Sequence, residues 1–417
     1  MQTNLLASLL ATREGREADE ILRKCVHCGF CTATCPTYQV TGDELDGPRG
    51  RIYLIKQVLE GKMPTEATQT HLDRCLTCRN CESTCPSGVH YSRLLDIGRH
   101  IVEQRVGRSP AQQLLRKTLQ TGLTRQWLFR PAYRTGMLLR PLLPAGLRNK
   151  LRPAAAPQTG GAQALRTHQR TMLLLDGCVQ PVMSPEINAA AARLLDKLGV
   201  QLVTAPKAGC CGAIHHHLNA TEAALQDMRN NIDAWWPLIE AGAEAIVMTA
   251  SGCGVTVRDY GYMLQDDAAY AAKARQVSAL CKDISEVLEG FADDLSKLAP
   301  APADQEKIMF HPPCTLQHGQ KIRGKVERLL AQHGIQVSLC ADSHLCCGSA
   351  GTYSILQSSL AQTLRDRKLN ALQATTPDRI VSANIGCIAH LQSGTETPVE
   401  HWIVLLERRL SAATSAG

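Results

Sequence analysis

Aromatic side chains are scarce in this 417-residue chain, where Phe, Trp and Tyr together make up 4%. Proteins that bind single-stranded nucleic acid stack its bases on aromatic rings, so this composition argues against a nucleic-acid partner. Long apolar runs are also missing, because no stretch approaches the ~20 apolar residues that a membrane-spanning helix needs. A short apolar stretch near the N-terminus has no basic region before it. We therefore expect neither a signal peptide nor a transmembrane helix.

Acidic residues are absent from residues 104–175, although that stretch contains thirteen Arg and Lys. Without these thirteen, the chain has 32 basic and 38 acidic residues, so its whole positive excess lies in this one stretch. Residues 105–152, called here the basic segment, also contain Leu, Trp, Phe and Tyr at spacings that allow apolar helix faces. The basic residues of this segment are Arg105, Arg108, Arg116, Lys117, Arg125, Arg130, Arg134, Arg140, Arg148, Lys150 and Arg152.

Helices that lie at a membrane surface combine basic and aromatic-aliphatic side chains in this way. We therefore expect the basic segment to dock on a membrane or on a membrane-bound acceptor. Two alternatives stay open. The apolar side chains can pack against the rest of the chain, and the basic ones can meet the acidic surface of a partner protein.

Nucleotide-binding motifs are missing as well. No Gly-x-Gly-x-x-Gly follows a predicted strand, and no phosphate-binding loop is present. If the protein works with a flavin or a nucleotide, another chain must therefore bind it.

Cysteine, in contrast, is abundant, with eighteen residues. A chain of 45.3 kDa does not need that many disulfides, so metal-bound thiolates in a reducing compartment are the expected state. The pattern Cys-x2-Cys-x2-Cys-x3-Cys-Pro begins at Cys25 and recurs 50 residues later at Cys75. Zinc prefers paired Cys-x2-Cys knuckles that lie well apart, whereas two complete copies of this pattern favour iron–sulfur clusters.

This spacing is typical of bacterial ferredoxins with two clusters, in which the fourth cysteine of each copy binds the other cluster. We therefore predict two 4Fe–4S clusters with crossed ligation. The expected ligands are Cys25, Cys28, Cys31 and Cys85 for cluster 1, and Cys75, Cys78, Cys81 and Cys35 for cluster 2. Such closed thiolate cages leave no open position for a substrate, so this part of the chain is expected to conduct electrons.

Charged residues lie between the two copies of the pattern. Charges and hydrogen bonds near cluster sulfurs tune a reduction potential, but a solvated face is the simpler interpretation, and we expect it here. The residues are Asp43, Glu44, Asp46, Arg49 and Arg51.

A second cysteine repeat occupies the rest of the chain. Each half offers one cysteine, then a Cys-Cys-Gly triplet, then a late Gly-Cys, and each of these follows a predicted strand. Four thiolates at one edge of a sheet can hold a zinc ion or an iron–sulfur cluster, and we favour clusters without excluding zinc. The expected centres are Cys178, Cys210, Cys211 and Cys253 in the first half, and Cys314, Cys346, Cys347 and Cys387 in the second. Cys281 and Cys340 are left over and are expected to be small buried residues.

Apolar periodicity supports an α+β multidomain fold, with an N-terminal helical ferredoxin domain followed by two pseudo-symmetric α/β halves. Helices are expected at 17–24, 48–60, 66–74, 187–198, 320–333 and 355–372. Strands are expected at 172–175, 201–204, 245–249, 307–310, 335–339 and 379–383. We expect four parts: the two-cluster domain at 1–104, the basic segment with a linker at 105–170, the first half at 171–300 and the second at 301–417.

The two triplets resemble the CCG domains of the heterodisulfide reductases and of several respiratory iron–sulfur subunits. In that family the late motif reads Cys-x2-Cys, whereas this chain has Ala250 and Asn384 in place of the first cysteine. The substitution argues against a five-cysteine non-cubane cluster and against disulfide reduction.

Over its full length the chain resembles the iron–sulfur subunits of bacterial glycolate oxidases. The segments that carry this resemblance are CVHCGFCTATCPTYQVTGDELDGPRGRIYLIKQVLEG, HLDRCLTCRNCESTCPSGV, NNIDAWWPLIEAGAEAI, DSHLCCGSAGTYSILQ and ANIGC. The resemblance implies a complex with FAD-binding partner subunits that oxidise glycolate to glyoxylate. This chain would pass electrons from the flavin to quinone or another membrane acceptor, as a peripheral protein on the cytoplasmic side of the inner membrane.

Other functions stay open. Iron–sulfur subunits of lactate and glycerol-3-phosphate dehydrogenases share the same skeleton, so the hydroxy acid depends on the longer matches. A CCG-type disulfide reductase subunit and a zinc-stapled scaffold for flavin subunits are the alternatives from other classes.

Overall fold

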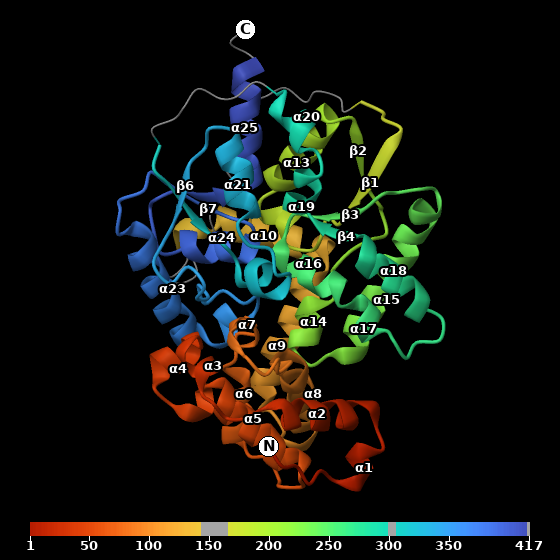
Figure 1. Cartoon of the computed structure of the whole chain (residues 1–417), viewed down its shortest axis with the longest axis vertical. Helices are drawn as coiled ribbons and strands as arrows, with labels where there is room; N and C mark the ends of the chain where they lie inside the picture. Colours follow the sequence, from red (N-terminus) through yellow and green to blue (C-terminus); the bar gives the residue numbers. More distant parts are fainter. Residues whose placement is uncertain (143–165, 299–305, 415–417) are drawn as a thin grey trace. The chain divides into compact units, whose positions relative to one another are not determined.

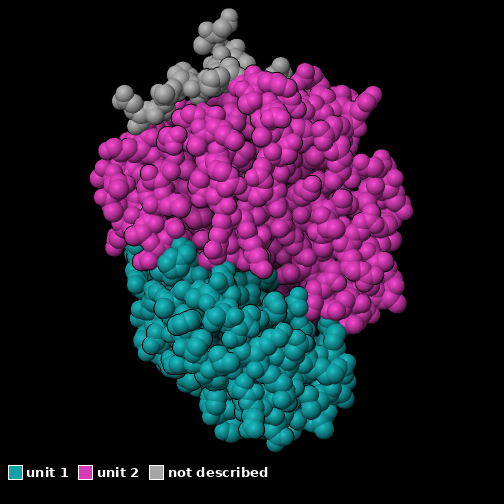
Figure 2. Space-filling view, viewed as in Figure 1, with its two compact units in different colours: residues 1–115, 344–368 teal, residues 116–343, 369–417 magenta. Residues whose placement is uncertain are grey.

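The computed structural model describes residues 1–142, 166–298 and 306–414 of the chain. It contains two compact units, which Figure 2 distinguishes by colour. Unit 1 consists of residues 1–115 and 344–368, and unit 2 of residues 116–343 and 369–417. Most of the predicted linker, up to residue 165, lies outside the described residues, as do three members of the basic segment, Arg148, Lys150 and Arg152. The four expected domain boundaries stay predictions.

Unit 1 is helical, as expected for the N-terminal part. The pyrrolidine ring of Pro48 starts α5, where a missing N–H costs nothing, and the Thr65 and Thr68 side chains form a capping box that starts α6. Its elements up to residue 105 are α1 (Ala7–Leu10), α2 (Arg13–Lys24), α3 (Phe30–Ala33), α4 (Pro36–Thr41), η1 (Glu44–Asp46), α5 (Pro48–Leu59), α6 (Glu66–Asp73), α7 (Asn80–Thr84) and α8 (Tyr91–Arg105). The predicted helices at 17–24, 48–60 and 66–74 are thereby confirmed, with α2 starting four residues earlier.

The core of unit 1 lies between α2, α5 and α8. Ile55 and Leu94 are fully buried there, in one cluster with Leu22. Gly98 lets α5 and α8 approach closely, because a Cβ at this position would stand 2.6 Å from the Ile55 side chain. This packing leaves the two cysteine loops at one end of the helices, and unit 1 also includes α22 (Tyr353–Leu356).

Unit 2 contains two four-stranded parallel sheets, drawn as arrows in Figure 1. The first has the strand order β2-β1-β3-β4 and the second the order β6-β5-β7-β8. The strands are β1 (Arg170–Leu174), β2 (Val200–Thr204), β3 (Ile246–Met248), β4 (Cys281–Asp283), β5 (Ile308–His311), β6 (Val337–Leu339), β7 (Arg379–Ser382) and β8 (Val399–His401). All six predicted strands are present to within two residues at each end, and the order is the same in both halves.

Helices connect these parallel strands, since a parallel pair needs a crossover connection. Trp235 and Tyr260 in the first half and Trp402 in the second are fully buried. The helices after α8 are α9 (Pro110–Thr124), α10 (Gln126–Leu138), η2 (Arg140–Leu142), α12 (Gln180–Met183), α13 (Glu186–Lys197), α14 (Ala213–His217), α15 (Thr221–Glu240), α16 (Ser251–Arg258), α17 (Tyr260–Met263), α18 (Ala271–Leu280), α19 (Ile284–Glu289), α20 (Ala292–Ser296), η3 (Thr315–Gly319), α21 (Lys325–Gln332), α23 (Ser358–Gln373), α24 (Ile385–Gln392) and α25 (Trp402–Thr414).

Two predicted helices have different bounds in the structure. The helix expected at 320–333 begins only at Lys325, because Gly324 takes a left-handed conformation that starts a new helix. The helix expected at 355–372 is divided by Gln357 into α22 and α23.

The two sheets meet through matching strand-to-helix turns. In the first half β3 runs into α16, and in the second β7 runs into α24. The Ser251 N–H donates to the Ala383 carbonyl at 3.1 Å, and the Gly252 N–H donates to the Asn384 side-chain oxygen at 3.2 Å. The predicted fold class, a helical ferredoxin domain followed by two related α/β halves, is confirmed.

Candidate metal centres

The two ferredoxin-type loops share a backbone conformation. His27 and Gly29 in the first loop have positive φ values of 56° and 84°, and Thr77 and Arg79, 50 residues later, have values of 52° and 57°. Left-handed residues at alternate positions curl each loop tightly, so that three cysteines can turn toward one point. In the second loop, the Thr77 N–H lies 3.5 Å from the Cys75 sulfur, as a donor to a thiolate would.

The cysteines proposed for cluster 1 line one cavity of about 450 Å³. Cys25, Cys28 and Cys31 come from the first loop, and Cys85 reaches the cavity from the end of α7. Cys28 is exposed at its mouth. The cavity rim includes Val26 and Phe30, whose exposed fractions are 67% and 60%.

The cysteines proposed for cluster 2 line a second cavity of about 400 Å³. Cys75, Cys78 and Cys81 come from the second loop, and Cys35 reaches the cavity from the first copy. The four thiols are buried or half-buried. The structure thus brings each fourth cysteine to the other copy's triplet, and the assignment of ligands remains our proposal.

The chemistry of these thiols fits a cationic metal core. Burial, together with the nearby thiols of Cys25 and Cys28, raises the pKa of Cys31 to about 11. Burial likewise raises the pKa of Cys81 far above its ordinary value, and its neighbours Cys78 and Cys75 add to the effect. Four thiolates cannot share so small a space unless a positive charge compensates them, as the iron atoms of a cluster do.

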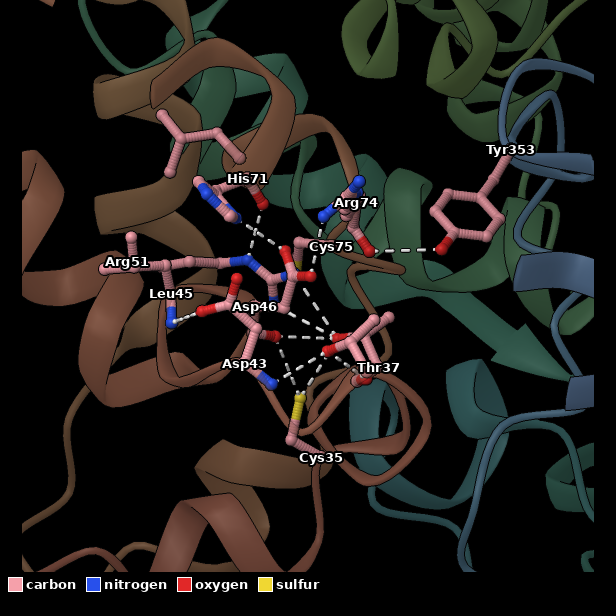
Figure 3. Close-up of polar contacts among 12 residues, drawn as sticks. Cys35, Thr37, Asp43, Leu45, Asp46, Arg51, His71, Arg74, Cys75 and Tyr353 are labelled. Carbon is pink, nitrogen blue, oxygen red and sulfur yellow. Dashed lines mark hydrogen bonds and ion pairs between the residues drawn. The ribbon is translucent and has the colours of Figure 1, made fainter. Parts of the chain in front are cut away.

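A buried network of charged residues borders the second cavity (Figure 3). Asp46 and Arg51 are 0% and 1% exposed, so the expected solvated face is wrong for these two residues. The Asp46 carboxylate lies 2.9 Å from the His71 ring and 2.9 Å from the Arg74 guanidinium. The Asp46 backbone carbonyl accepts a hydrogen bond from the Thr37 hydroxyl at 2.9 Å and lies 3.7 Å from the Cys35 sulfur.

Arg51 is held by three partners. Its Nε donates to the His71 carbonyl at 2.7 Å, both terminal nitrogens lie 3.3 Å from the Thr37 hydroxyl, and one lies 3.7 Å from the Asp46 carboxylate. Burial opposes its charge, but the thiol of Cys75 and the other acidic groups nearby outweigh burial and raise the pKa of Arg51. The guanidinium therefore stays protonated beside the second cavity.

The first Cys-Cys-Gly set is brought together in unit 2. Cys178 follows β1, Cys210 and Cys211 follow β2, and Cys253 lies in the first turn of α16 after β3. All four therefore lie beyond the carboxyl ends of adjacent parallel strands. The thiols form a chain of contacts, in which Cys210 meets Cys178 and Cys211, and Cys211 meets Cys253. Hydrogen bonds from the Cys210 and Cys253 thiols lower the pKa of Cys211.

Buried polar side chains brace this first triplet. Asn231 accepts from the Gly209 N–H at 2.8 Å and donates to the Cys210 carbonyl at 2.7 Å, and the Tyr260 hydroxyl donates to the Cys211 carbonyl at 2.9 Å. The glycine of the triplet is required by the backbone, because Gly212 has a φ of 90° and a Cβ there would stand 3.0 Å from the Ala224 carbonyl oxygen. The triplet thus forms a fixed turn.

The second Cys-Cys-Gly set is divided between the units. Cys314 follows β5 and Cys387 lies in the first turn of α24, both in unit 2, whereas Cys346 and Cys347 belong to unit 1. Within unit 2, the Asn384 side-chain nitrogen lies 3.7 Å from the Cys387 sulfur. The four-cysteine centre predicted for this half stays a prediction.

The two remaining cysteines behave as the sequence suggests. Cys281 is buried in β4 with its sulfur 3.7 Å from the Gly254 carbonyl, and burial raises its pKa to about 12. Cys340 is also buried.

The basic segment is described up to Leu142. Arg108 cannot contribute to an exposed basic surface. Its side chain is 6% exposed and pairs with Asp73 at 2.8 Å and Glu103 at 2.5 Å. In unit 2, α10 exposes Arg130, Arg134 and Trp127. No helix among the residues that the structure describes has both the length and the apolar content to cross a bilayer.

Sequence reasoning missed the residues that support the cysteines. Asn231 and Tyr260 are ordinary polar residues within helices, and nothing in their spacing marks them as braces. Asn231, Asp46 and Arg51 could have been found by their place in segments that resemble known subunits. Asn231 lies in NNIDAWWPLIEAGAEAI, and the two charged residues lie in DELDGPRGR, whereas Tyr260 lies outside these segments.

Two family models match the chain. Residues 21–89 match the 4Fe-4S dicluster domain, and residues 172–258 and 308–392 match the cysteine-rich domain known as CCG.

Curated relatives extend over the whole chain. The glycolate oxidase iron-sulfur subunit of Escherichia coli (strain K12) is 56% identical over 410 residues, which cover 98% of this chain and 99% of the relative. The probable glycolate oxidase iron-sulfur subunit of Bacillus subtilis (strain 168) is 30% identical, covering 92% and 91%. Lactate utilization protein A of Bacillus licheniformis is 23% identical and covers 51% of this chain and 87% of its own length. A crystal structure of a hypothetical protein from Helicobacter pylori, 10% identical, has a TM-score of 0.56 over 96% of this chain and 73% of that one, a likeness of fold alone.

Proposed function

Because the chain belongs to the family of glycolate oxidase iron–sulfur subunits, we propose that it carries electrons between a flavin and a membrane acceptor. FAD-binding partner subunits remove two electrons and two protons from glycolate, which becomes glyoxylate. Quinone, or another membrane acceptor, takes up the two electrons together with two protons. The observation that carries the proposal is the 56% identity to a glycolate oxidase subunit over nearly the whole chain.

In this proposal the eight ferredoxin-type cysteines hold two clusters. Cys25, Cys28, Cys31 and Cys85 provide one cage of thiolates, and Cys75, Cys78, Cys81 and Cys35 provide the other. A bound 4Fe–4S cluster supplies one-electron chemistry, which suits the splitting of a two-electron oxidation into single steps. The loops keep each set of four thiols in place. They exclude water more fully from the second set, whose thiols are buried or half-buried, than from the first, where Cys28 is exposed.

The Cys-Cys-Gly sets extend the proposal to one further iron–sulfur or zinc centre in each half. For the first half, the chain of contacts from Cys178 through Cys210 and Cys211 to Cys253 supports it. The late motif carries Ala250 and Asn384 where the related CCG domains carry a cysteine, so these sets offer four thiols each. That number suits a closed electron-transfer centre better than a five-cysteine catalytic one.

A further part of the proposal is peripheral attachment to the cytoplasmic face of the inner membrane. Its support is the exposed surface of α10 and η2, where Trp127, Leu138 and Leu142 are 70–82% exposed beside exposed arginines. Apolar side chains of this kind enter the headgroup region, and each basic residue near an anionic surface adds about 1 kcal/mol.

The test is substrate-dependent reduction of the complex. The chain is purified anaerobically with the subunits that accompany it, and glycolate, lactate or glycerol 3-phosphate is added while EPR signals of reduced clusters are recorded. Glycolate should produce these signals fully, and the other two should produce them weakly or not at all. Full reduction by lactate alone, or by glycerol 3-phosphate alone, would assign the chain to a different dehydrogenase.

A further inference from the structure

We propose that Arg51 gives cluster 2 a higher reduction potential than cluster 1, so that the first electron to enter the pair resides on the four thiolates of Cys35, Cys75, Cys78 and Cys81. The inference rests on the proposed ligand sets and concerns a residue that is not itself a ligand. Arg51 is a positioning residue and not a catalytic one, because it acts on the reduction potential of cluster 2 and touches no substrate.

The first step is the place of the charge. Arg51 lines the cavity of cluster 2 and is 1% exposed. A reduced cluster carries one more negative charge than an oxidised one. A fixed positive charge beside it therefore favours reduction, and it acts most strongly where water cannot screen it.

The second step is the net charge of the network. Asp46 is the buried carboxylate of this network and faces the guanidinium of the half-buried Arg74 at 2.9 Å, while the exposed carboxylate of Asp43 lies within 4.8 Å of it. Arg99, which is also buried, adds another guanidinium, since its Nη2 donates to the Cys75 carbonyl at 2.9 Å. Among the buried groups, Arg51 and Arg99 outnumber Asp46, so the buried part of the network carries a net positive charge.

The third step is the contrast with cluster 1. The arginine that lines its cavity is Arg49, which is partly exposed and pairs with Glu44 at 2.6 Å. A surface pair of this kind is close to neutral as seen from a distance, and water screens it. Solvent at the exposed Cys28 does stabilise a reduced cluster 1. The burial of Arg51, which leaves its field unscreened, is the larger effect in our proposal.

The proposed order of the two reduction potentials agrees with the surroundings of the two cluster cavities in unit 1. Cys28 and the exposed rim of Val26 and Phe30 make cluster 1 the site open to an outside donor. Tyr353 lies on the side of cluster 2, where its hydroxyl donates to the Arg74 carbonyl at 3.2 Å, and burial, with the nearby thiols of Cys75 and Cys346, raises its pKa. An electron that enters at Cys28 is thus drawn inward, toward the second Cys-Cys-Gly triplet.

The experiment is an EPR-monitored redox titration of the full chain with its clusters bound. Signals are assigned beforehand with Cys28→Ser for cluster 1 and Cys78→Ser for cluster 2. Wild type should reduce cluster 2 first. Arg51→Gln should lower the reduced-to-oxidised ratio of cluster 2 at a fixed potential by tenfold or more, which is 59 mV for a one-electron couple. Asp46→Asn, which removes the opposing charge, should raise that ratio.

Control variants separate charge from structure. Arg51→Lys keeps the charge but loses the guanidinium hydrogen bonds, so it should stay within threefold of wild type. Arg49→Gln removes the partly exposed arginine two residues away and should leave cluster 2 unchanged.

A wild-type titration in which cluster 1 is reduced first overturns the inference, as does a shift for Arg51→Lys equal to that for Arg51→Gln. If Arg51→Gln does not assemble clusters, Asp46→Asn decides alone, because a lowered or unchanged ratio contradicts the proposal. Failure of the ligand assignment is distinguishable, since Cys35→Ser would then perturb the signal that Cys28→Ser perturbs and leave the one that Cys78→Ser perturbs.

Discussion

The His401 ring at the end of β8 is hydrogen-bonded to the carbonyl of Thr249, which follows β3, with Nε2 and the oxygen 2.9 Å apart. Because a carbonyl can only accept, Nε2 carries the proton, and Nδ1 accepts from the Ile403 N–H at 3.1 Å. His401 is 1% exposed. A neutral imidazole with one fixed tautomer therefore joins the two related halves of unit 2.

This arrangement predicts an acid-sensitive fold. Burial lowers the pKa of His401 to about 3 from an ordinary value of 6.5. Above pH 6.5 the ring is neutral in both the folded and the unfolded chain, so this histidine does not make the free energy of unfolding depend on pH. As pH falls from 6.5 toward 3, only the unfolded chain takes up the proton, so the free energy of unfolding falls, by at most roughly 4 kcal/mol at the lower limit.

Urea unfolding of the full chain between pH 7 and 5 measures this loss. His401→Gln, which can keep one donor and one acceptor, should be less stable at pH 7 and should lose less stability on acidification than wild type. The exposed His100, changed to Gln, is the matched control and should leave the pH dependence as in wild type. Equal pH slopes for wild type and His401→Gln would contradict the assignment.

Crossed ligation is the second prediction. Cys35 lines the cavity of the second loop and Cys85 that of the first. Cys35→Ser should therefore change the EPR signal that Cys75→Ala removes and leave the signal that depends on Cys25. Cys85→Ser should do the reverse. The assignment is wrong if Cys35→Ser and Cys25→Ala remove one signal while Cys75→Ala removes another.

The third prediction concerns metal in the first Cys-Cys-Gly set. Cys211 contacts two of the other three thiols, so Cys211→Ser should lower the iron or zinc content of the purified full chain by one centre. Cys281→Ser is a matched control, because Cys281 is equally buried but lies in β4 and bonds a backbone carbonyl. Metal analysis measures how much iron or zinc is lost, and EPR shows whether the lost centre is an iron–sulfur cluster. A Cys211→Ser protein with unchanged metal content would exclude a centre at this set.

The sequence predicted the strands and the cysteine loops well because both depend on local patterns. Continuous apolar runs such as the one around Met172 mark buried parallel strands, and fixed cysteine spacings mark ligand loops. The strand β8 was missed, and so was β4, because Lys282 and Asp283 make two of the three residues of β4 charged. The pairing of β4 with β3 is a tertiary property, which a run of that length does not encode.

The charged residues between the cysteine repeats show what a local sequence pattern cannot predict. In the sequence, Asp46 and Arg51 look like part of a solvated face. In the structure Asp46 meets His71, which lies 25 residues away, and Arg51 meets the carbonyl of the same residue. A charge can be buried only when partners from distant positions satisfy it, and no local pattern announces those partners. The membership of Cys346 and Cys347 in unit 1 was unpredictable for the same reason.

The last prediction tests the attachment of α10 to a membrane. Arg130, Arg134 and Arg140 are changed to Glu together, which replaces attraction to anionic lipid by repulsion at each position. Flotation of the complex with vesicles of anionic lipid should fall strongly, while gel filtration should show the subunits still together. Salt alone is a poor test, because it weakens any electrostatic attachment.

The matched control changes two exposed basic residues of another helix. Arg23 and Lys24 at the end of α2 lie outside the basic segment and are exposed. Their change to Glu should leave flotation as in wild type. If the α10 variant loses its partner subunits while the isolated chain floats as before, the exposed arginines and Trp127 belong to a partner interface, and the membrane proposal fails. If flotation falls and the complex persists, α10 is the part of the chain that meets the bilayer.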